Sequence, residues 1–287
     1  MTRIAILADV HGNLPALEAV LEDLARQRVD EVLVGGDLVG RGPEGSKVAR
    51  RIRELGLPAI GGNHEDYLLG FRDGELSEER RQAEEWAAAR WMAAELEDED
   101  AVYLASLPFS LARPHLRLVH GTPRTNREGI GPWTADEELA GYHGEVAERV
   151  LVCAHTHRPL MREVGGGLVV NVGSVGLPFN RDRRAQYAIF TADPATGWQV
   201  EPRQVPYDLE RIFEIYETSG FLAEGGVTAR LLRLELEHAT PLLVPFLEWA
   251  KVVGVPATSA QLEPFFASFR PGQSLREFFR GLEQTAG

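Results

Sequence analysis

The sequence of 287 residues predicts an α/β fold built on a parallel sheet. Two observations support this prediction. Short apolar, strand-like runs alternate with amphipathic helical stretches in the order β-α-β-α-β over residues 3–60, a pattern typical of parallel strands joined by right-handed crossovers. A polar residue also follows each run directly, at the edge where open α/β sheets bind ligands.

The first predicted strand is the near-continuous apolar run at residues 3–8, which is typical of a strand buried on both faces. Asp9 and His11 follow at its carboxyl end. Asn13 is a candidate N-cap and Pro15 falls in the first turn of the next helix. The apolar face of that helix comprises Leu14, Leu17, Val20, Leu21 and Leu24.

A second strand is predicted at residues 31–35, closed by Gly36 and Asp37. A helix over about residues 44–55 then leads to a third apolar run at residues 57–60. The turn that follows, Gly61-Gly62-Asn63-His64-Glu65, has two interpretations. Asn63 either caps the next helix from Glu65 onward, or it presents a ligand oxygen beside His64 on a turn that glycine permits.

Residues 66–205 again contain helical and strand-like segments, and polar residues again follow several of the strands. Residues 66–106 are helical in pattern and heavily charged, and their acidic run at 95–100 is expected to be a solvated helix end rather than a metal site. Two later strands end in histidine-bearing fragments. The predicted strands are residues 116–119 and 149–154, a hairpin of 160–164 with 167–170, and an antiparallel pair of 186–191 with 198–205.

Composition limits the function classes. A net charge of -13 argues against a protein that binds bulk nucleic acid, because such a protein needs a basic face. No apolar run reaches the roughly 18 residues of a membrane helix, and the N-terminus lacks the pattern of a signal peptide. The single cysteine, Cys153, is expected to be a small buried hydrophobic residue and fits a cytoplasmic protein.

After Tyr207 the sequence pattern becomes helical throughout. We predict a catalytic domain at residues 1–207 and a C-terminal helical extension at 208–287, which lacks any cluster of metal-ligand type. The extension is expected to pack on the core or to form a subunit contact in a homo-oligomer, and a lid over the site is the less favoured alternative. Its apolar pattern comprises Leu231, Leu234, Leu236, Phe246, Trp249, Phe265, Phe266, Phe278 and Phe279.

Imidazoles and carboxylates gather at the predicted strand ends. The fragments contain Asp9, His11, Asp37, Asn63, His64, His120, His155 and His157. So many polar groups at one edge of a buried sheet would be costly unless a ligand satisfied them. Mixed imidazole and carboxylate ligands suit manganese, iron, zinc or nickel. Two ions roughly 3.5 Å apart, bridged by one carboxylate, would use this many ligands and would suit phosphoryl transfer.

The ordered blocks resemble the calcineurin-like metallophosphoesterase superfamily over about residues 3–205. The blocks are Asp9-x-His11, Gly36-Asp37, Gly62-Asn63-His64-Glu65, His120-Gly121 and His155-Thr156-His157. The chain is similar to the small prokaryotic branch of phosphodiesterases and diadenosine tetraphosphatases, a likeness that extends to residues 171–176. The resemblance implies a four-layer fold in which helices flank two mixed β-sheets, and a hydrolase of phosphoric esters.

The resemblance also implies a role for each site residue. The first metal ion would take Asp9, His11, Asp37 and His157, and the second Asp37, Asn63, His120 and His155. A hydroxide between the ions would attack phosphorus, and His64 would protonate the leaving oxygen. Glu65, where the family has aspartate, or the adjacent Asp66 would support His64. Ala154 replaces the usual glycine before the paired histidines, a small change.

Three arginines follow motif blocks closely and are candidate phosphate contacts, with a surface salt bridge as the alternative for each: Arg41, Arg124 and Arg181. The expected cofactor is a pair of divalent ions, manganese first. The expected substrate is a small phosphorylated molecule or a nucleotide, with diadenosine polyphosphates as the alternative. A silent scaffold, like the retromer subunit that resembles these enzymes, is less favoured because His64 and all predicted ligands are present.

Overall fold

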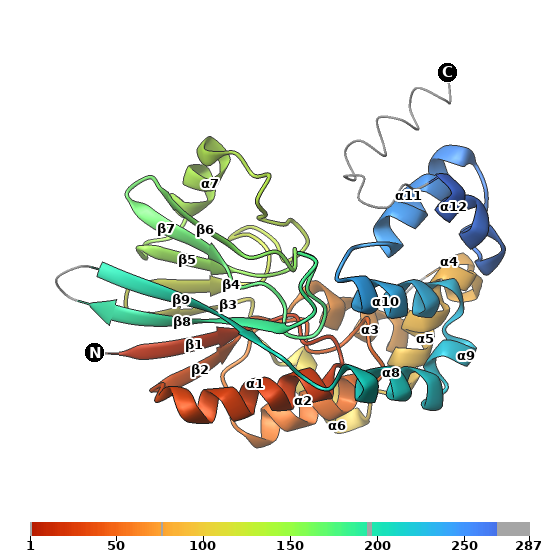
Figure 1. The fold of residues 1–287 in the computed structure, drawn as a ribbon, viewed down its shortest axis with the longest axis horizontal. Helices are drawn as coiled ribbons and strands as arrows, with labels where there is room; N and C mark the ends of the chain where they lie inside the picture. Colours follow the sequence, from red (N-terminus) through yellow and green to blue (C-terminus); the bar gives the residue numbers. More distant parts are fainter. Residues whose placement is uncertain (1, 76, 194–196, 269–287) are drawn as a thin grey trace.

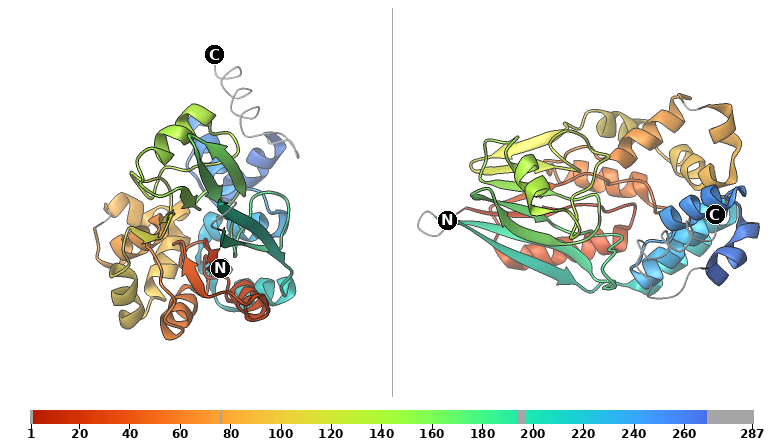
Figure 2. Two further views of the ribbon diagram at one scale, coloured as in Figure 1. Left: turned by 90° about the vertical axis from the view of Figure 1, so that its left-hand side faces the viewer. Right: turned by 90° about the horizontal axis from the view of Figure 1, so that it is seen from above.

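The computed structural model describes residues 2–75, 77–193 and 197–268. Two mixed β-sheets pack face to face, and helices cover their outer faces (Figures 1 and 2). The four-layer arrangement that the resemblance implies is therefore confirmed, together with the α/β class.

The first sheet has the strand order β2-β1-β8-β9. Strands β1 and β2 are parallel, whereas β8 and β9 add an antiparallel pair, as expected. The bounds are β1 Arg3–Leu7, β2 Glu31–Val34, β8 Ala185–Asp193 and β9 Gly197–Val205.

The third apolar run, residues 57–60, was predicted to be a strand, and that prediction is wrong. The run forms only an isolated parallel bridge between Val34 and Ala59. Pro58 accepts a hydrogen bond from the Val34 amide but has no N–H with which to continue a ladder.

The second sheet has the order β3-β4-β5-β7-β6, with three parallel strands in the middle and antiparallel strands at both edges. The bounds are β3 Ser110–Arg113, β4 Leu116–Val119, β5 Val150–Cys153, β6 Leu160–Val164 and β7 Gly167–Asn171. All but β3 were predicted.

Alternate side chains of β1 enter different cores. Ile4 and Ile6 pack between the two sheets, whereas Ala5 and Leu7 face the helices on the outer side of the first sheet. Cys153 is fully buried in a third core beneath α7 (Asp136–His143), as its apolar neighbours predicted. The burial of β1 on both of its faces explains why its sequence is a nearly continuous apolar run.

The first two helices begin close to where local signals predict. The Asn13 side chain caps α1 and accepts a hydrogen bond of 3.1 Å from the Ala16 amide. The acidic run at 95–100 is only partly solvated, because Asp100 is buried and pairs with Arg50. The helices are α1 Leu14–Gln27, α2 Gly45–Glu54, α3 Asn63–Arg72, α4 Glu78–Gln82, the 3₁₀ turn Glu84–Trp86, α5 Ala87–Ala94 and α6 Asp98–Ala105.

Residues 209–268, the described part of the C-terminal region, are mainly helical, as predicted, and lie at one end of the sheets (Figure 1). Ile212 and Leu232 share a core with Leu17 of α1, so the division at residue 207 remains a prediction. Phe278 and Phe279 lie outside the described residues. The helices are α8 Leu209–Thr218, α9 Phe221–Glu224, α10 Gly226–His238, α11 Leu243–Val253, the 3₁₀ turn Ser259–Gln261 and α12 Leu262–Ser268. Among the described helices, none has the length and apolarity needed to cross a bilayer.

Candidate metal centre

The predicted ligands converge at the carboxyl ends of neighbouring strands. Asp9 and Asp37 follow β1 and β2 in the first sheet, whereas His120 and His155 follow β4 and β5 in the second. Asn63 is the first residue of α3. The face-to-face packing of the sheets therefore brings together fragments that lie far apart in the sequence.

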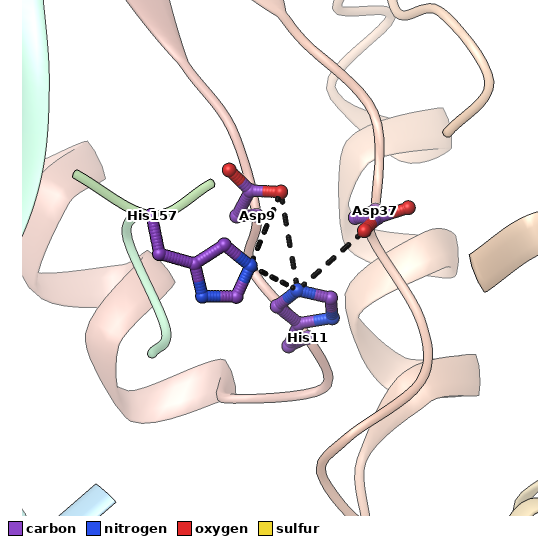
Figure 3. A group of neighbouring side chains, drawn as sticks. All are labelled: Asp9, His11, Asp37 and His157. Atoms are coloured by element: carbon purple, nitrogen blue, oxygen red, sulfur yellow. Dashed lines mark hydrogen bonds and ion pairs between the residues drawn. The ribbon is translucent and has the colours of Figure 1, made fainter. Parts of the chain in front are cut away.

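Asp9, His11, Asp37 and His157 form one buried cluster (Figure 3), in which one ligand atom of each residue lies within 4.8 Å of the others. The His11 Nε2 is 3.6 Å from the Asp37 Oδ2. The His157 Nε2 is 3.6 Å from the Asp9 Oδ1. All four side chains are at most 2% exposed, so their polar groups lie outside bulk water.

A second cluster shares Asp37 and adds His120 and His155, again within 4.8 Å. The Asn63 Oδ1 lies 3.1 Å from the His120 Nε2 and 2.8 Å from the His155 Nδ1. The structure thus groups all seven predicted ligands into two sets that meet at one carboxylate.

Backbone carbonyls fix the tautomer of three imidazoles. The Nδ1 of His11 lies 3.1 Å from the Val39 oxygen, that of His120 lies 2.9 Å from the Gly35 oxygen, and that of His157 lies 2.5 Å from the Leu177 oxygen. A proton on each Nδ1 leaves the Nε2 lone pair directed into the cluster, which is the usual support of a metal-binding histidine.

Five of these residues adopt a left-handed backbone conformation, with φ between 51° and 64°: Asp9, His11, Asp37, His155 and His157. Residues other than glycine adopt it at a cost of about 1 kcal/mol or more each, and they do so mainly at functional sites. Loop-to-loop hydrogen bonds hold the strained residues, such as the 3.0 Å bond from the His11 amide to the Asp37 oxygen.

The residues fit a metal ion by two criteria. The Asp9 Oδ1 is a buried oxygen without a hydrogen-bond donor among the described residues. The Nε2 atoms of His11 and His157 lie 3.0 Å apart, although each carries a lone pair. A cation between these atoms would satisfy the oxygen and relieve the repulsion of the lone pairs.

Burial sets the charge of the imidazoles. It lowers the pKa of His11 to about 3 and the pKa of His155 to about 4, so both rings are neutral at pH 7. Burial alone would also lower the pKa of His120, but the Asp37 carboxylate beside it raises that pKa to about 10. A metal ion that binds the His120 ring must therefore displace the proton that the Asp37 carboxylate stabilises there.

The Glu65 carboxylate binds backbone amides of the loop that carries Asp37, rather than the His64 ring. It accepts hydrogen bonds from the amides of Gly62, Asp37, Leu38 and Val39, at 2.6–3.2 Å. Burial, reinforced by the Asp37 charge, raises its pKa to about 7. Glu65 therefore positions the loop that carries Asp37, and Gly62 rather than Asn63 is the N-cap of α3.

His64 lies at the margin of the clusters. Its backbone amide donates to the Asp37 Oδ1 at 2.9 Å, and its Nε2 accepts a 3.2 Å hydrogen bond from the Arg41 Nε. Gly62 permits this approach, because a Cβ at that position would overlap the Asp37 carboxylate. Burial lowers the pKa of His64 well below its usual range.

The three candidate arginines differ in their surroundings. Arg41 contacts His64 directly. The Arg124 Nε donates to the Glu145 carboxylate at 2.8 Å, and its guanidinium lies over the Tyr142 ring. Arg181 is exposed. Only for Arg41 does the described part of the chain show a contact with a predicted site residue.

Sequence reasoning missed several residues that hold the site. The Asn171 Nδ2 donates to the Ala154 oxygen at 2.6 Å and the Thr156 hydroxyl at 2.9 Å, which fixes the loop of the paired histidines. The family resemblance includes residues 171–176, but it does not imply this role for Asn171. Glu235 and Tyr216 bind Arg41 from the C-terminal helices, and no local motif marks them.

Comparisons with known proteins agree with this geometry. The sequence model of a family described as "Calcineurin-like phosphoesterase superfamily domain" matches residues 2–194. The chain is 32% identical to a symmetrical bis(5'-nucleosyl)-tetraphosphatase of Psychromonas ingrahamii, over 49% of each chain. It is 27% identical to the phosphodiesterase YfcE of Escherichia coli, over 62% of this chain and 82% of YfcE.

A solved structure is also similar. The metallophosphoesterase of Sphaerobacter thermophilus has a TM-score of 0.69 and 28% identity, over 83% of this chain and 100% of that one. In contrast, the chain spans about half the length of the tetraphosphatase that it matches.

Proposed function

This chain belongs to the calcineurin-like phosphoesterase superfamily, and we propose that it is a phosphoesterase dependent on two metal ions that hydrolyses small phosphorylated molecules or nucleotides. The observation that carries the proposal is the position of Asp37, which belongs to both buried clusters of ligand type. A carboxylate shared by two ligand sets is the arrangement expected of a two-metal site.

Asp9, His11, Asp37 and His157 would hold one ion, and Asp37, Asn63, His120 and His155 the other. When bound, the two ions would acidify water and neutralise charge on the phosphoryl oxygens. Manganese is the first choice for this donor set, with iron, zinc or nickel as alternatives.

His64 would protonate the leaving oxygen. In the structure its Nε2 accepts a hydrogen bond from Arg41, so the proton of the neutral ring is on Nδ1. An anionic substrate would attract the Arg41 guanidinium to its phosphoryl oxygens and free the Nε2 atom. The negative charge of the substrate would also raise the lowered pKa of His64, so that the ring could hold a proton for the leaving group.

Phosphodiesters and phosphomonoesters are the proposed substrates, supported by the likeness to the phosphodiesterase YfcE. Hydrolysis of diadenosine polyphosphates is the second candidate. The likeness to the symmetrical tetraphosphatase favours it, although that likeness covers only half of each chain.

Hydrolysis of bis-p-nitrophenyl phosphate by the full chain tests the proposal. We expect turnover with added manganese and its loss on chelation. Asp37→Asn provides the matched inactive protein, because it alters the shared ligand while keeping the size of the side chain. If the folded, manganese-loaded protein shows no turnover of this ester or of diadenosine tetraphosphate, the fold serves instead as a non-catalytic scaffold.

A further inference from the structure

A cavity of about 780 Å³ adjoins His64. Residues of α3, α5, α10 and α11 line it, so the C-terminal helices form one wall. Its volume lies within the range of about 300–1,000 Å³ that is typical of sites for small molecules. Asn63 and Arg41 also line the cavity, which therefore continues directly from the predicted metal centre.

Aromatic and apolar side chains dominate the lining. Tyr67 and Trp86 lie with their ring centroids 6.5 Å apart, at an interplanar angle of 66°. Helix α11 contributes Leu247 and also Val244, a residue that is 50% exposed. Half-exposed apolar groups beside a polar site are typical of a surface that a ligand covers.

The cavity also carries local positive charge. Arg80 lies over the Trp86 ring, 5.9 Å from its centroid, and Lys251 and Arg41 add two more cations. Glu85 and Glu248 are the lining carboxylates. Glu235 pairs with Arg41 from outside the lining. Cations beside an aromatic ring, here Arg80 on Trp86, nevertheless suit an anionic ligand with a flat aromatic group.

We propose that this cavity binds the aromatic part of the leaving group, so that the C-terminal helices select phosphoesters with a flat aromatic substituent, of which a nucleoside is one. This inference rests on the proposed function for the orientation of the ligand. His64, the proposed acid, lines the cavity. The oxygen that His64 protonates would therefore connect the phosphorus to a group inside the cavity.

Calorimetric titration of the manganese-loaded full chain tests the inference without turnover. Phenylphosphonate and methylphosphonate form one pair of ligands, because their carbon–phosphorus bonds resist hydrolysis. The methylene phosphonate analogues of adenosine 5'-monophosphate and ribose 5-phosphate, in which a CH₂ group replaces the ester oxygen, form the other pair. We expect the aromatic member of each pair to bind about 10-fold more tightly, since stacking on an aromatic side chain stabilises a ring by roughly this factor.

Two variants should reduce the ratio of affinities within each ligand pair toward unity. Trp86→Ala removes an aromatic wall of the cavity, and Val244→Glu places a carboxylate in it. Val252→Glu is the matched control. Val252 is 43% exposed on the same helix and does not line the cavity, so its variant should keep the wild-type preference.

Equal binding within both pairs, or a preference that survives both variants, would overturn the inference. A preference in the phenyl pair alone would support an aryl group and exclude a nucleoside. A protein that fails to hydrolyse any ester but shows the preference would contradict the proposed function and leave the binding site intact.

Discussion

Glu235 of α10 and Arg41 of the loop after β2 form an ion pair with an Nη1–Oε2 distance of 3.2 Å. The Glu235 side chain is 1% exposed and that of Arg41 is 16% exposed. The opposite edge of the guanidinium donates to the His64 Nε2. A C-terminal helix thereby positions the arginine that contacts the proposed acid.

Glu235→Gln tests this link. The Glu235 Oε1 also accepts hydrogen bonds from the Leu242 and Leu243 amides, and an amide oxygen can keep both. The new amide nitrogen would instead face the Arg41 donors. We expect kcat/KM to fall about 10-fold, the size of one lost charge-assisted hydrogen bond, with metal content unchanged. Glu237→Gln on the same helix is the control, because Glu237 pairs with Arg233 and, among the described residues, shows no contact with Arg41. Equal effects in both variants would refute the link.

His64→Ala should remove the proposed acid and leave the metals bound. The imidazole contacts Arg41, whereas only its backbone amide binds Asp37, and alanine keeps that amide. We expect kcat to fall about 10²–10⁴-fold, the usual contribution of general acid catalysis. Metal content by mass spectrometry reveals whether the role is correct. Loss of both ions would mean that His64 supports the metal centre instead.

The side chains of the candidate site could be located from the sequence because each of them is marked by a local signal. A polar residue that follows an apolar strand lies at the sheet edge wherever that strand pairs, so Asp9, Asp37 and His120 could be placed before the sheets were known. The N-cap Asn13 is another local signal, since its partner is only three residues away.

Contacts made by packing could not be predicted in the same way. Arg41 and Glu235 are 194 residues apart, and they meet only because α10 packs on the core shared with α1. Glu65 stands next to His64 in sequence, but the first turn of α3 directs its carboxylate toward backbone amides. Trp86 lies within an unremarkable charged stretch, and only the position of α11 makes it a cavity wall.

Glu65→Gln should destabilise the loop of Asp37. One carboxylate oxygen binds the Asp37 and Gly62 amides, and a glutamine nitrogen in its place would face both donors. We expect the free energy of unfolding to fall by about 2–3 kcal/mol, measured by urea denaturation. Asp66→Asn is the control, since Asp66 is exposed, and should change it by less than about 0.5 kcal/mol. A loss of rate in Glu65→Gln without any loss of stability would instead favour direct support of His64.

Asp23 should stabilise the fold in a manner that depends on pH. Burial would raise its pKa, but hydrogen bonds from the Tyr187 hydroxyl at 2.7 Å and from Arg203 lower it below its ordinary value of 3.8. A lowered carboxyl pKa adds stability above the unfolded value and loses it as the pH falls through the folded value. We expect Asp23→Asn to cost about 1–2 kcal/mol at pH 7.

That cost should begin to shrink below about pH 4, where the unfolded carboxylate takes up a proton, and it should disappear once the pH falls below the lowered pKa of the folded carboxylate. Urea denaturation of both proteins at pH 7 and at pH 3.5 measures the difference. An equal cost at both values would show that Asp23 acts through its shape rather than through its charge.

The shared position of Asp37 makes a prediction about metal stoichiometry. Asp9 has a ligand atom in one cluster only, whereas Asp37 contributes to both. We therefore expect wild-type protein to bind two manganese ions, Asp9→Asn to bind one with unchanged affinity, and Asp37→Asn to lose affinity for both by at least about 10-fold. Titration of the metal-free proteins by calorimetry, with thermal stabilisation as a second readout, separates these outcomes. Two ions retained in Asp37→Asn would mean that the clusters bind metal independently, and the carboxylate between them would then have no bridging role.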